Sequence, residues 1–339
     1  MSRKEYTPSV LFFKRMIAAT LATIILLLTV LNIVNGVRLH RALNRLEQYA
    51  ASEAAREAEE EARAAEEEAE RLRNADLPEK AKPAGEADAT AILGESRVIA
   101  HALGSVDGVS GLNCLEGFVQ SYNAGVRVFE ADFRQTTDGY VVLRHDWRGG
   151  WQENVDEAHV PTLAEFLERP ILEQYTPLSF TQLLLLMEQY PDVCVITDTK
   201  FMEPEAVAAQ FRQMLAEARK LGLTYLFDRM YVQVYSPLHY QIVDTVYHFP
   251  HYIYTLYQDN FEQTEQSFRD RANFAQGKGI EAITMWDFQW NEDWRPIAEY
   301  RNLKIYVHTV NDREAARELL LKGVSAVYTD SLVPADMEG

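Results

Sequence analysis

The sequence predicts an α/β fold in which eight parallel strands, each followed by a helix, close into a barrel. Two observations support this prediction. After Glu95, short apolar runs alternate with longer helical patterns, which is typical of repeated strand–helix units and a parallel sheet. Eight such units occupy residues 97–339, the usual size of a TIM (β/α)8 barrel. A doubly wound open sheet is the alternative, but no glycine-rich phosphate loop follows the first strand.

The expected elements follow from local pattern. Apolar, strand-like runs are found at Arg97–Leu103, Arg127–Asp132, Val193–Thr199, Tyr231–Tyr235, Tyr252–Leu256, Ala282–Met285, Lys304–Val310 and Ala326–Thr329. Helical patterns between them include Phe118–Ala124, Phe180–Gln189, Pro204–Lys220, Phe261–Gln276 and Asp312–Leu321. A Thr-Thr-Asp-Gly turn after the second strand leads to an extra short strand at Tyr140–His145 and a small insertion up to Thr176. Such insertions in barrels lie above the C-terminal ends of the strands, where active sites are built.

An apolar segment near the N-terminus predicts a transmembrane helix. Residues 16–34 contain no charge, and as a helix they would reach roughly 28 Å, close to the hydrocarbon thickness of a bilayer. The alternative is a cleaved signal peptide, but the run is long for one and no small-x-small cleavage site follows it.

The basic residues around this span predict its orientation. Four precede it, in a basic tail over 1–15, and three follow it before residue 46. The positive-inside rule then favours a cytoplasmic N-terminus. We therefore expect a single-pass protein of the cell membrane with an extracytoplasmic C-terminal body.

Between the span and the barrel we expect a helical stalk over 35–75 and a linker over 76–96. Residues 51–71 comprise 8 Ala, 9 Glu, 3 Arg and one Ser, nearly all strong helix formers. Glu59 with Arg63 adds a favourable i,i+4 pair. Pro78 and Pro83 then end the helix and begin the linker.

Composition excludes some functions. The 339 residues carry a formal charge of −18, so most of the surface would repel a polyanion and we expect no nucleic-acid partner. The two cysteines, Cys114 and Cys194, are too few for a disulfide scaffold and lack zinc-ligand spacing.

Polar residues gather where the predicted strands end. Glu130 and Asp132 are two apart, so their side chains share one face of a strand. Two inward carboxylates repel unless a cation lies between them. With Asp198 they would form an all-oxygen site for one hard divalent cation, Mg²⁺ or Ca²⁺. His101, His145 and Lys200 fall at neighbouring strand ends, and although any one of these residues has a simple structural explanation such as helix capping, the set as a whole indicates a catalytic site.

These residues resemble the glycerophosphodiester phosphodiesterases, within the larger group of phosphatidylinositol-phospholipase-C-like phosphodiesterases. The matching segments occur in order and cover nearly all of 97–339. They are His101-Ala-Leu-Gly104, Asn113-Cys-Leu-Glu-Gly-Phe118, Phe129-Glu-Ala-Asp132, Thr137-Asp-Gly139, Arg144-His-Asp146, Thr197-Asp-Thr-Lys200, Val307-His-Thr-Val-Asn311 and Gly323-Val-Ser-Ala-Val-Tyr-Thr-Asp330.

The resemblance implies a metal-dependent phosphodiesterase. It assigns the cation to Glu130, Asp132 and Asp198, acid and base catalysis to His101 and His145, and phosphate binding to Lys200. It also implies attack by a neighbouring substrate hydroxyl to give a cyclic phosphate that water later opens; direct attack by His101 is an open alternative. The chemistry is consistent, because a phosphodiester needs its oxygens neutralised and two proton carriers. Residues that could line the substrate pocket are Arg144, Gln233, Trp286 and His308.

The sequence departs from the family pattern in three places. The usual His-Arg-Gly opening is His101-Ala-Leu here, so an arginine is missing that Arg144 or Arg148 could replace. The common Glu-Asn pair appears as Leu112-Asn113, and the third metal ligand is an Asp where many members have Glu.

We therefore expect hydrolysis of a glycerophosphodiester to an alcohol and glycerol phosphate, with a lysophospholipid or phospholipid as the alternative substrate. The Asp198-Thr-Lys200 segment is similar to sphingomyelinase D enzymes, which makes a lipid phosphodiesterase of that type the first rival. A catalytically silent, membrane-tethered barrel that serves as a binding module is the second, because of the missing Arg and Glu.

Overall fold

The computed structural model describes residues 16, 88–147 and 160–338. The predicted transmembrane helix at 16–34, apart from Met16, lies outside these residues, as do the basic tail, the stalk, the first part of the linker and Arg148. Within the described ranges no helix has both the length and the apolar character needed to cross a bilayer.

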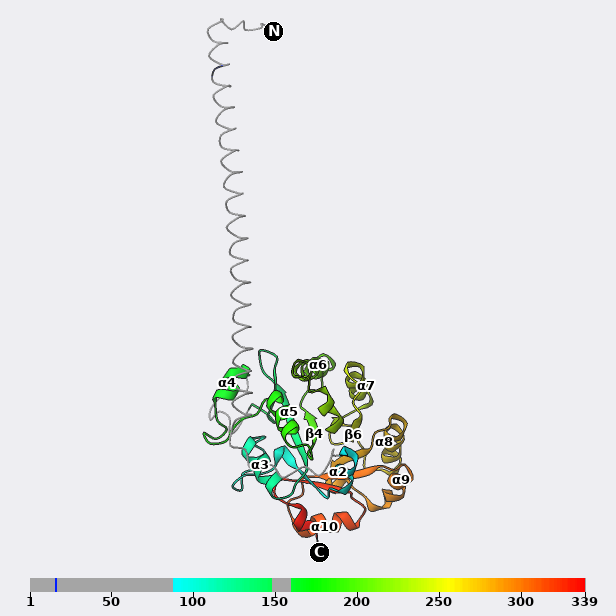
Figure 1. Cartoon of the computed structure of the whole chain (residues 1–339). Helices are drawn as coiled ribbons and strands as arrows, with labels where there is room; N and C mark the ends of the chain where they lie inside the picture. The colour runs from blue at the N-terminus through cyan, green and yellow to red at the C-terminus, as the bar shows by residue number, and fades with distance from the viewer. Residues whose placement is uncertain (1–15, 17–87, 148–159, 339) are drawn as a thin grey trace, which may run out of the picture. The chain divides into compact units, whose positions relative to one another are not determined.

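Eight parallel strands form a closed barrel, as the sequence predicts. The sheet order is β1-β9-β8-β7-β6-β5-β4-β2, and β1 also pairs with β2, which closes the ring. Figure 1 shows helices around the outside of these strands. The strands are β1 (Val98–Ala100), β2 (Val128–Gln135), β4 (Cys194–Thr199), β5 (Met230–Val234), β6 (His251–Thr255), β7 (Ala282–Trp286), β8 (Lys304–His308) and β9 (Ala326–Thr329).

The described helices follow the expected alternation. They are α2 (Ala89–Glu95), α3 (Leu115–Asn123), α4 (Leu163–Glu168), α5 (Phe180–Gln189), α6 (Pro204–Leu221), α7 (Pro237–Val246), α8 (Glu265–Lys278), α9 (Arg295–Tyr300) and α10 (Arg313–Leu321). The predicted bounds of α5 and β9 agree with the structure residue for residue. Side-chain caps start several helices, as when the Ser179 hydroxyl accepts a hydrogen bond from the backbone N–H of Gln182.

Several strand bounds differ from the prediction by one or two residues, and the C-terminal bounds of the first two strands differ by three. The first strand ends at Ala100, because a 3-10 turn, η1 (His101–Leu103), follows it with left-handed backbone at Ala102 (φ 48°) and Leu103 (φ 63°). The second strand runs on to Gln135, because its last three residues pair with the antiparallel strand β3 (Val141–Leu143) outside the barrel. β3 is the extra short strand that the sequence predicts.

A helix closes the N-terminal end of the barrel. The linker predicted over 76–96 includes α2. Its residues Ala89 and Leu93 are buried against apolar residues of the barrel strands. That cluster contains Ile99, Val128, Cys194, Ile196, Tyr231, Ile253, Ala282, Tyr306, Ala326 and Tyr328. Apolar packing therefore fills this end of the barrel, which leaves the C-terminal end for the polar residues.

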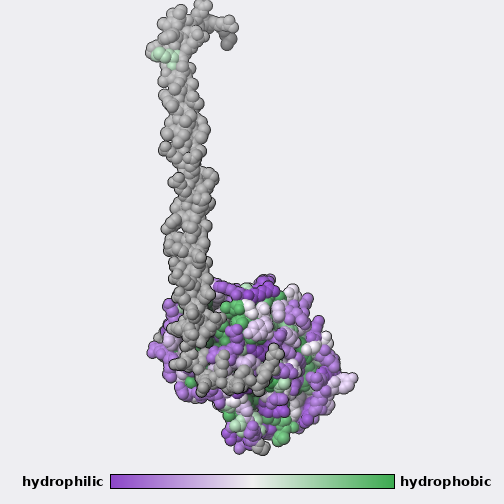
Figure 2. Space-filling view, viewed as in Figure 1, coloured by the Kyte–Doolittle hydropathy of each residue, from purple (hydrophilic) through white to green (hydrophobic). Residues whose placement is uncertain are grey.

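Most apolar side chains are inside. Figure 2 shows hydrophilic colours over much of the visible described surface, with hydrophobic patches between them. Beyond Met16, the large hydrophobic residues that are exposed in the described segments are Leu172, Met202, Tyr225, Leu238, Trp286, Phe288, Tyr300 and Leu321.

Candidate active site

Three carboxylates meet inside the C-terminal half of the barrel. Glu130 and Asp132 come from β2 and Asp198 from β4, and the parallel pairing of these strands places Asp132 level with Asp198. Each offers one oxygen, and these three atoms lie within 4.8 Å of one another. All three residues are buried. Glu130 and Asp132 lie in the middle of β2 rather than at its predicted end, since β2 is longer than expected.

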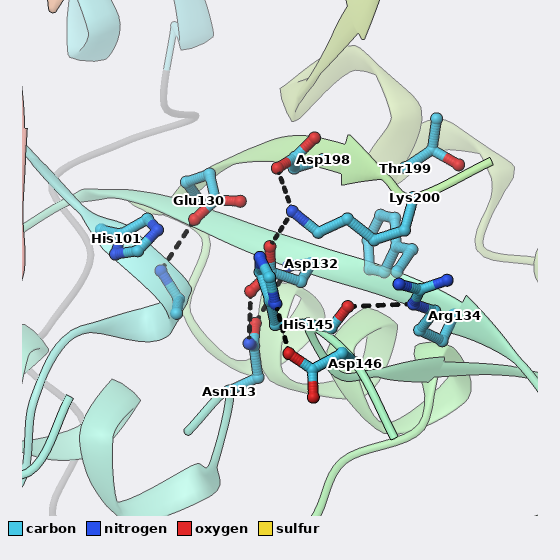
Figure 3. A network of polar contacts seen from close by, with 12 residues as sticks. His101, Asn113, Glu130, Asp132, Arg134, His145, Asp146, Asp198, Thr199 and Lys200 are labelled. Atoms are coloured by element: carbon cyan, nitrogen blue, oxygen red, sulfur yellow. Dashed lines mark hydrogen bonds and ion pairs between the residues drawn. The ribbon is translucent and has the colours of Figure 1, made fainter. Parts of the chain in front are cut away.

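Lys200 lies among these carboxylates. Its Nζ is 2.5 Å from Asp132 Oδ1 and also forms an ion pair with Asp198, as the dashed lines in Figure 3 show. One ammonium against three carboxylates leaves a formal charge of −2 if all are ionised. Buried charge of this size needs compensation, and one divalent cation would supply it.

One oxygen atom of Glu130 also indicates that a cation belongs at this site. Its Oε2 accepts a 2.7 Å hydrogen bond from the backbone N–H of Ala102, whereas Oε1 is buried and has no hydrogen-bond partner. Burial, followed by the charge of Asp132, raises the pKa of Glu130 above its ordinary value. Because a buried polar atom without a partner is costly, this oxygen is suited to a metal ion. The all-oxygen donor set therefore fits a hard cation, Mg²⁺ or Ca²⁺.

Neighbouring side chains fix two of the three carboxylates. Asn113 is buried, donates from Nδ2 to Asp132 Oδ2 at 2.7 Å and accepts the backbone N–H of Asp132 at 3.0 Å. The hydroxyls of Tyr235 and Tyr257 donate to Asp198, the latter at 3.0 Å from either oxygen. Although burial opposes it, Lys200 and then Asn113 hold the pKa of Asp132 below its usual range. The sequence assigned none of these supporting roles, although Asn113 is in a family-like segment and the tyrosines follow strands.

His101 lies directly after β1 and is held by a carboxylate from the other end of the chain. Its Nδ1 is 2.8 Å from Asp330 Oδ1, and Asn311 Nδ2 donates to the other oxygen of Asp330 at 2.6 Å. Burial lowers the pKa of His101, but the bond to Asp330 and the charges of Glu130 and Asp132 outweigh it and raise that pKa to about 9. Sequence reasoning missed Asp330, although it follows β9 at the C-terminal end.

His145 is placed differently from His101. It follows β3, and its Nδ1 is 2.8 Å from Asp146 Oδ2, as Figure 3 shows. Its side chain is 57% exposed, against 31% for His101. Arg134 Nε donates to the backbone oxygen of His145 at 2.9 Å. Because a carboxylate engages Nδ1 in both histidines, Nε2 is the nitrogen that each can use for proton transfer.

The predicted pocket residues occupy three settings. Arg144 is buried, and its Nε donates to the backbone oxygen of Asp146 at 2.8 Å. Gln233 is buried on β5, where its Oε1 accepts hydrogen bonds from Thr255 at 2.9 Å and Tyr328 at 3.3 Å. Trp286 and His308 end β7 and β8, with ring centroids 4.4 Å apart.

Solved structures share this fold. A Silicibacter pomeroyi protein described as a glycerophosphoryl diester phosphodiesterase aligns with a TM-score of 0.59 and 20% identity, over 74% of this chain and 95% of that one. An Oleispira antarctica phosphodiesterase, crystallised with the product sn-glycerol-3-phosphate, aligns with a TM-score of 0.57 and 15% identity, over 69% and 93%. A Parabacteroides distasonis glycerophosphodiester phosphodiesterase aligns with a TM-score of 0.54 and 17% identity, over 69% and 92%. No curated protein sequence matches significantly.

The fold and the buried acidic site define an eight-stranded α/β barrel with a candidate metal site at the C-terminal ends of its strands. The model of the glycerophosphoryl diester phosphodiesterase family matches residues 111–333, and the chain belongs to this family. The resemblance that its motifs indicate is therefore confirmed, as is the prediction that it is an enzyme.

Proposed function

We propose that this protein hydrolyses a glycerophosphodiester to an alcohol and glycerol phosphate. The observation that carries the proposal is the buried cluster of Glu130, Asp132 and Asp198 with Lys200 among them and His101 beside them. With a divalent cation bound, the cluster would place positive charge beside the phosphate oxygens, and His101 would supply a proton carrier at the C-terminal end of the barrel. The Oleispira antarctica relative, crystallised with sn-glycerol-3-phosphate, supports this substrate class.

Glu130, Asp132 and Asp198 would hold one divalent cation, Mg²⁺ or Ca²⁺. When bound, that ion neutralises negative charge on the phosphate and lowers the barrier to attack on phosphorus. Lys200 adds a second positive charge at the same place and holds Asp132 and Asp198 in position. Arg144, which is buried and precedes His145 in the chain, is the described arginine proposed to replace the one missing from the His-Arg-Gly segment.

The two histidines would transfer the protons. A substrate hydroxyl next to the phosphate attacks phosphorus, one imidazole accepts its proton, and the other protonates the leaving alcohol oxygen as the P–O bond breaks. Water then opens the resulting cyclic phosphate with the two imidazoles in reversed roles. Asp330 and Asp146 orient the rings through Nδ1, which leaves Nε2 for the reacting oxygens.

A product assay tests this function. Glycerophosphocholine, a lysophospholipid and sphingomyelin are incubated with the protein, with and without a chelator. We expect glycerol phosphate and free choline from the first substrate, loss of turnover with chelator and recovery with Mg²⁺ or Ca²⁺. Preferred release of choline from sphingomyelin would instead support the sphingomyelinase D alternative that Asp198-Thr-Lys200 suggests.

Histidine variants separate the enzyme from a silent barrel. The double replacement of His101→Ala and His145→Ala should abolish hydrolysis while thermal unfolding stays cooperative. His248→Ala is the matched control, because His248 is also bonded to an aspartate, Asp244, but lies on the surface at the end of α7. Unchanged turnover in the double variant would remove the proposed mechanism.

We also propose that residues 16–34 anchor the protein in the cell membrane with the barrel outside the cytoplasm. The uncharged run in the sequence supports this proposal. Fractionation after alkaline washing should leave the protein with the membranes, and protease added to intact cells should remove the barrel. Release into the wash would contradict the membrane anchor. Complete protection from protease would contradict the proposed orientation of the barrel.

A further inference from the structure

Four aromatic side chains lie at or just after the ends of three adjacent strands, at the C-terminal end of the barrel. They form what we term the aromatic wall and are Tyr257 after β6, Trp286 and Phe288 at and after the end of β7, and His308 at the end of β8. The centroid of His308 lies 4.4 Å from that of Trp286 and 4.7 Å from that of Tyr257. Tyr257 and Trp286 are 5.6 Å apart, and Phe288 stacks at 6.4 Å from Trp286 with the ring planes 8° apart. The four rings are therefore continuous.

The aromatic wall joins the carboxylate cluster directly. The Tyr257 hydroxyl donates to both oxygens of Asp198 at 3.0 Å. At its other end the wall reaches solvent, since Trp286 is 40% and Phe288 72% exposed. A substrate whose phosphate lay at the carboxylates would thus place one of its ester groups against the rings.

The exposed aromatic surface of the wall lies at the end of the barrel that carries the carboxylate cluster. The other exposed aromatic residues in the described segments, Tyr225 and Tyr300, precede β5 and β8 and so lie at the opposite end of the barrel. Large apolar side chains exposed beside a reaction site, in contrast, are typical of a ligand-binding surface. The two exposed rings of the wall therefore point to a group that prefers aromatic faces.

The charges near the aromatic wall indicate what kind of substrate group it would bind. Asp287 lies between Trp286 and Phe288 in the chain, is exposed, and has no side-chain hydrogen bond or ion pair to any residue in the described ranges. Burial, followed by the charges of His101 and Lys200, lowers the pKa of His308 to about 3, which disfavours a positive charge on this ring. Aromatic faces and a carboxylate attract a cation and repel an anion. A cation without N–H groups suits these rings best, because faces of rings do not satisfy ammonium hydrogen bonds.

We propose that the aromatic wall, with Asp287, binds a quaternary ammonium group on the alcohol side of the diester, as in a trimethylammonium alcohol such as choline. This inference rests on the proposed function and specifies its substrate class. His308 contributes a second feature of the site, a buried Nε2 that has no hydrogen-bond partner in the described part of the chain and is free to bond an oxygen of the same substrate.

The first test measures selectivity. kcat/KM is determined for glycerophosphocholine, glycerophosphoethanolamine and glycerophosphoglycerol. We expect the choline diester to exceed the glycerol diester by about 30-fold, equivalent to about 2 kcal/mol, the upper range of a desolvated cation–π contact. Trp286→Ala should bring the ratio close to one, mainly through KM, while Trp286→Phe should restore part of it. Asp287→Asn and Phe288→Ala should each lower the ratio several-fold.

Tyr300→Ala is the matched control, because it removes an exposed aromatic ring from the other end of the barrel. It should leave the ratio unchanged. Equal kcat/KM for the three diesters, or a ratio that Trp286→Ala does not alter, would overturn the inference while the proposed hydrolysis stands.

The second test does not depend on turnover. Tetramethylammonium chloride is titrated into the full-length protein at constant ionic strength, against sodium chloride, and tryptophan fluorescence is recorded. We expect saturable quenching in the wild type and in Tyr300→Ala, and none in Trp286→Ala. If no diester is hydrolysed but this binding is present, the proposed function fails and the ammonium site stands; absence of binding overturns the site.

Discussion

The two ends of the barrel are built from different residues. At the N-terminal end, α2 packs Ala89 and Leu93 against an apolar cluster. At the C-terminal end, the strands carry buried carboxylates with Lys200 among them and His101 nearby, and the aromatic wall adjoins this cluster through Tyr257. The comparison teaches that burial has opposite consequences at the two ends: it stabilises the first and leaves the second with charge that needs a cation.

The largest effect should come from breaking the charged end. Glu130→Gln removes a proposed metal ligand and retains the size of the side chain. We expect kcat/KM to fall by about 10³-fold, or about 4 kcal/mol, because one group that neutralises transition-state charge is lost. The effect is measured by assays of diester hydrolysis and of the metal bound to the purified variant.

The matched control is Glu217→Gln. Glu217 is also a buried carboxylate, but it bonds Thr181 and Gln213 on the outer helices. The Glu217→Gln variant should keep full metal content and full activity. If Glu130→Gln bound the ion and turned over at the wild-type rate, Glu130 would not be a ligand.

Substitutions at the apolar, N-terminal end of the barrel should change the stability of the protein. Leu93 is 3% exposed in α2, and Leu93→Ala should lower the free energy of unfolding by about 2–4 kcal/mol, because it removes buried methyl groups and leaves a cavity. Leu321→Ala, at a residue that is 82% exposed, should change it by less than about 0.5 kcal/mol. Urea denaturation followed by circular dichroism measures both. Equal effects of the two variants would show that α2 does not support the barrel.

A smaller effect is expected from the residue that orients His101. Asp330→Asn should reduce kcat/KM by about 10-fold, as loss of an orienting partner commonly does. Asp330 raises the pKa of His101, so its removal lowers that pKa, and the limb of the pH–rate profile that reports His101 should move to lower pH. Asp244→Asn, in the surface pair with His248, is the control and should leave the profile unchanged. A drop in rate without movement of the profile would contradict the assignment.

The smallest effect should come from the turn η1, which follows β1 at the C-terminal end of the barrel. Ala102 has φ 48° and ψ 44°, a left-handed conformation that costs a non-glycine residue about 1–2 kcal/mol. Glycine removes this strain but adds about 0.5–1 kcal/mol of chain entropy to the unfolded state. Ala102→Gly should therefore raise the free energy of unfolding by up to about 1 kcal/mol. A clear decrease would mean that the methyl group packs more favourably than the strain costs.

Much of the fold could be predicted from local sequence. Apolar runs located all eight barrel strands, and helical periodicity located α5 residue for residue. The helix α2 was not predicted, because its residues follow the proline-containing segment and its burial depends on the barrel it closes. The end of β2 was also missed, since only pairing with β3 extends that strand to Gln135.

The sequence by itself determined the chemistry of the site: Glu130 and Asp132 share a face because strand side chains alternate, and their carboxylates imply a hard cation. Only the tertiary structure decided which groups meet. Asp198 becomes level with Asp132 through the pairing of β2 with β4. Asp330 reaches His101 from 229 residues away because β1 pairs with β9 as well as β2 when the barrel closes. Such contacts depend on long-range strand pairing, which no local pattern of residues specifies.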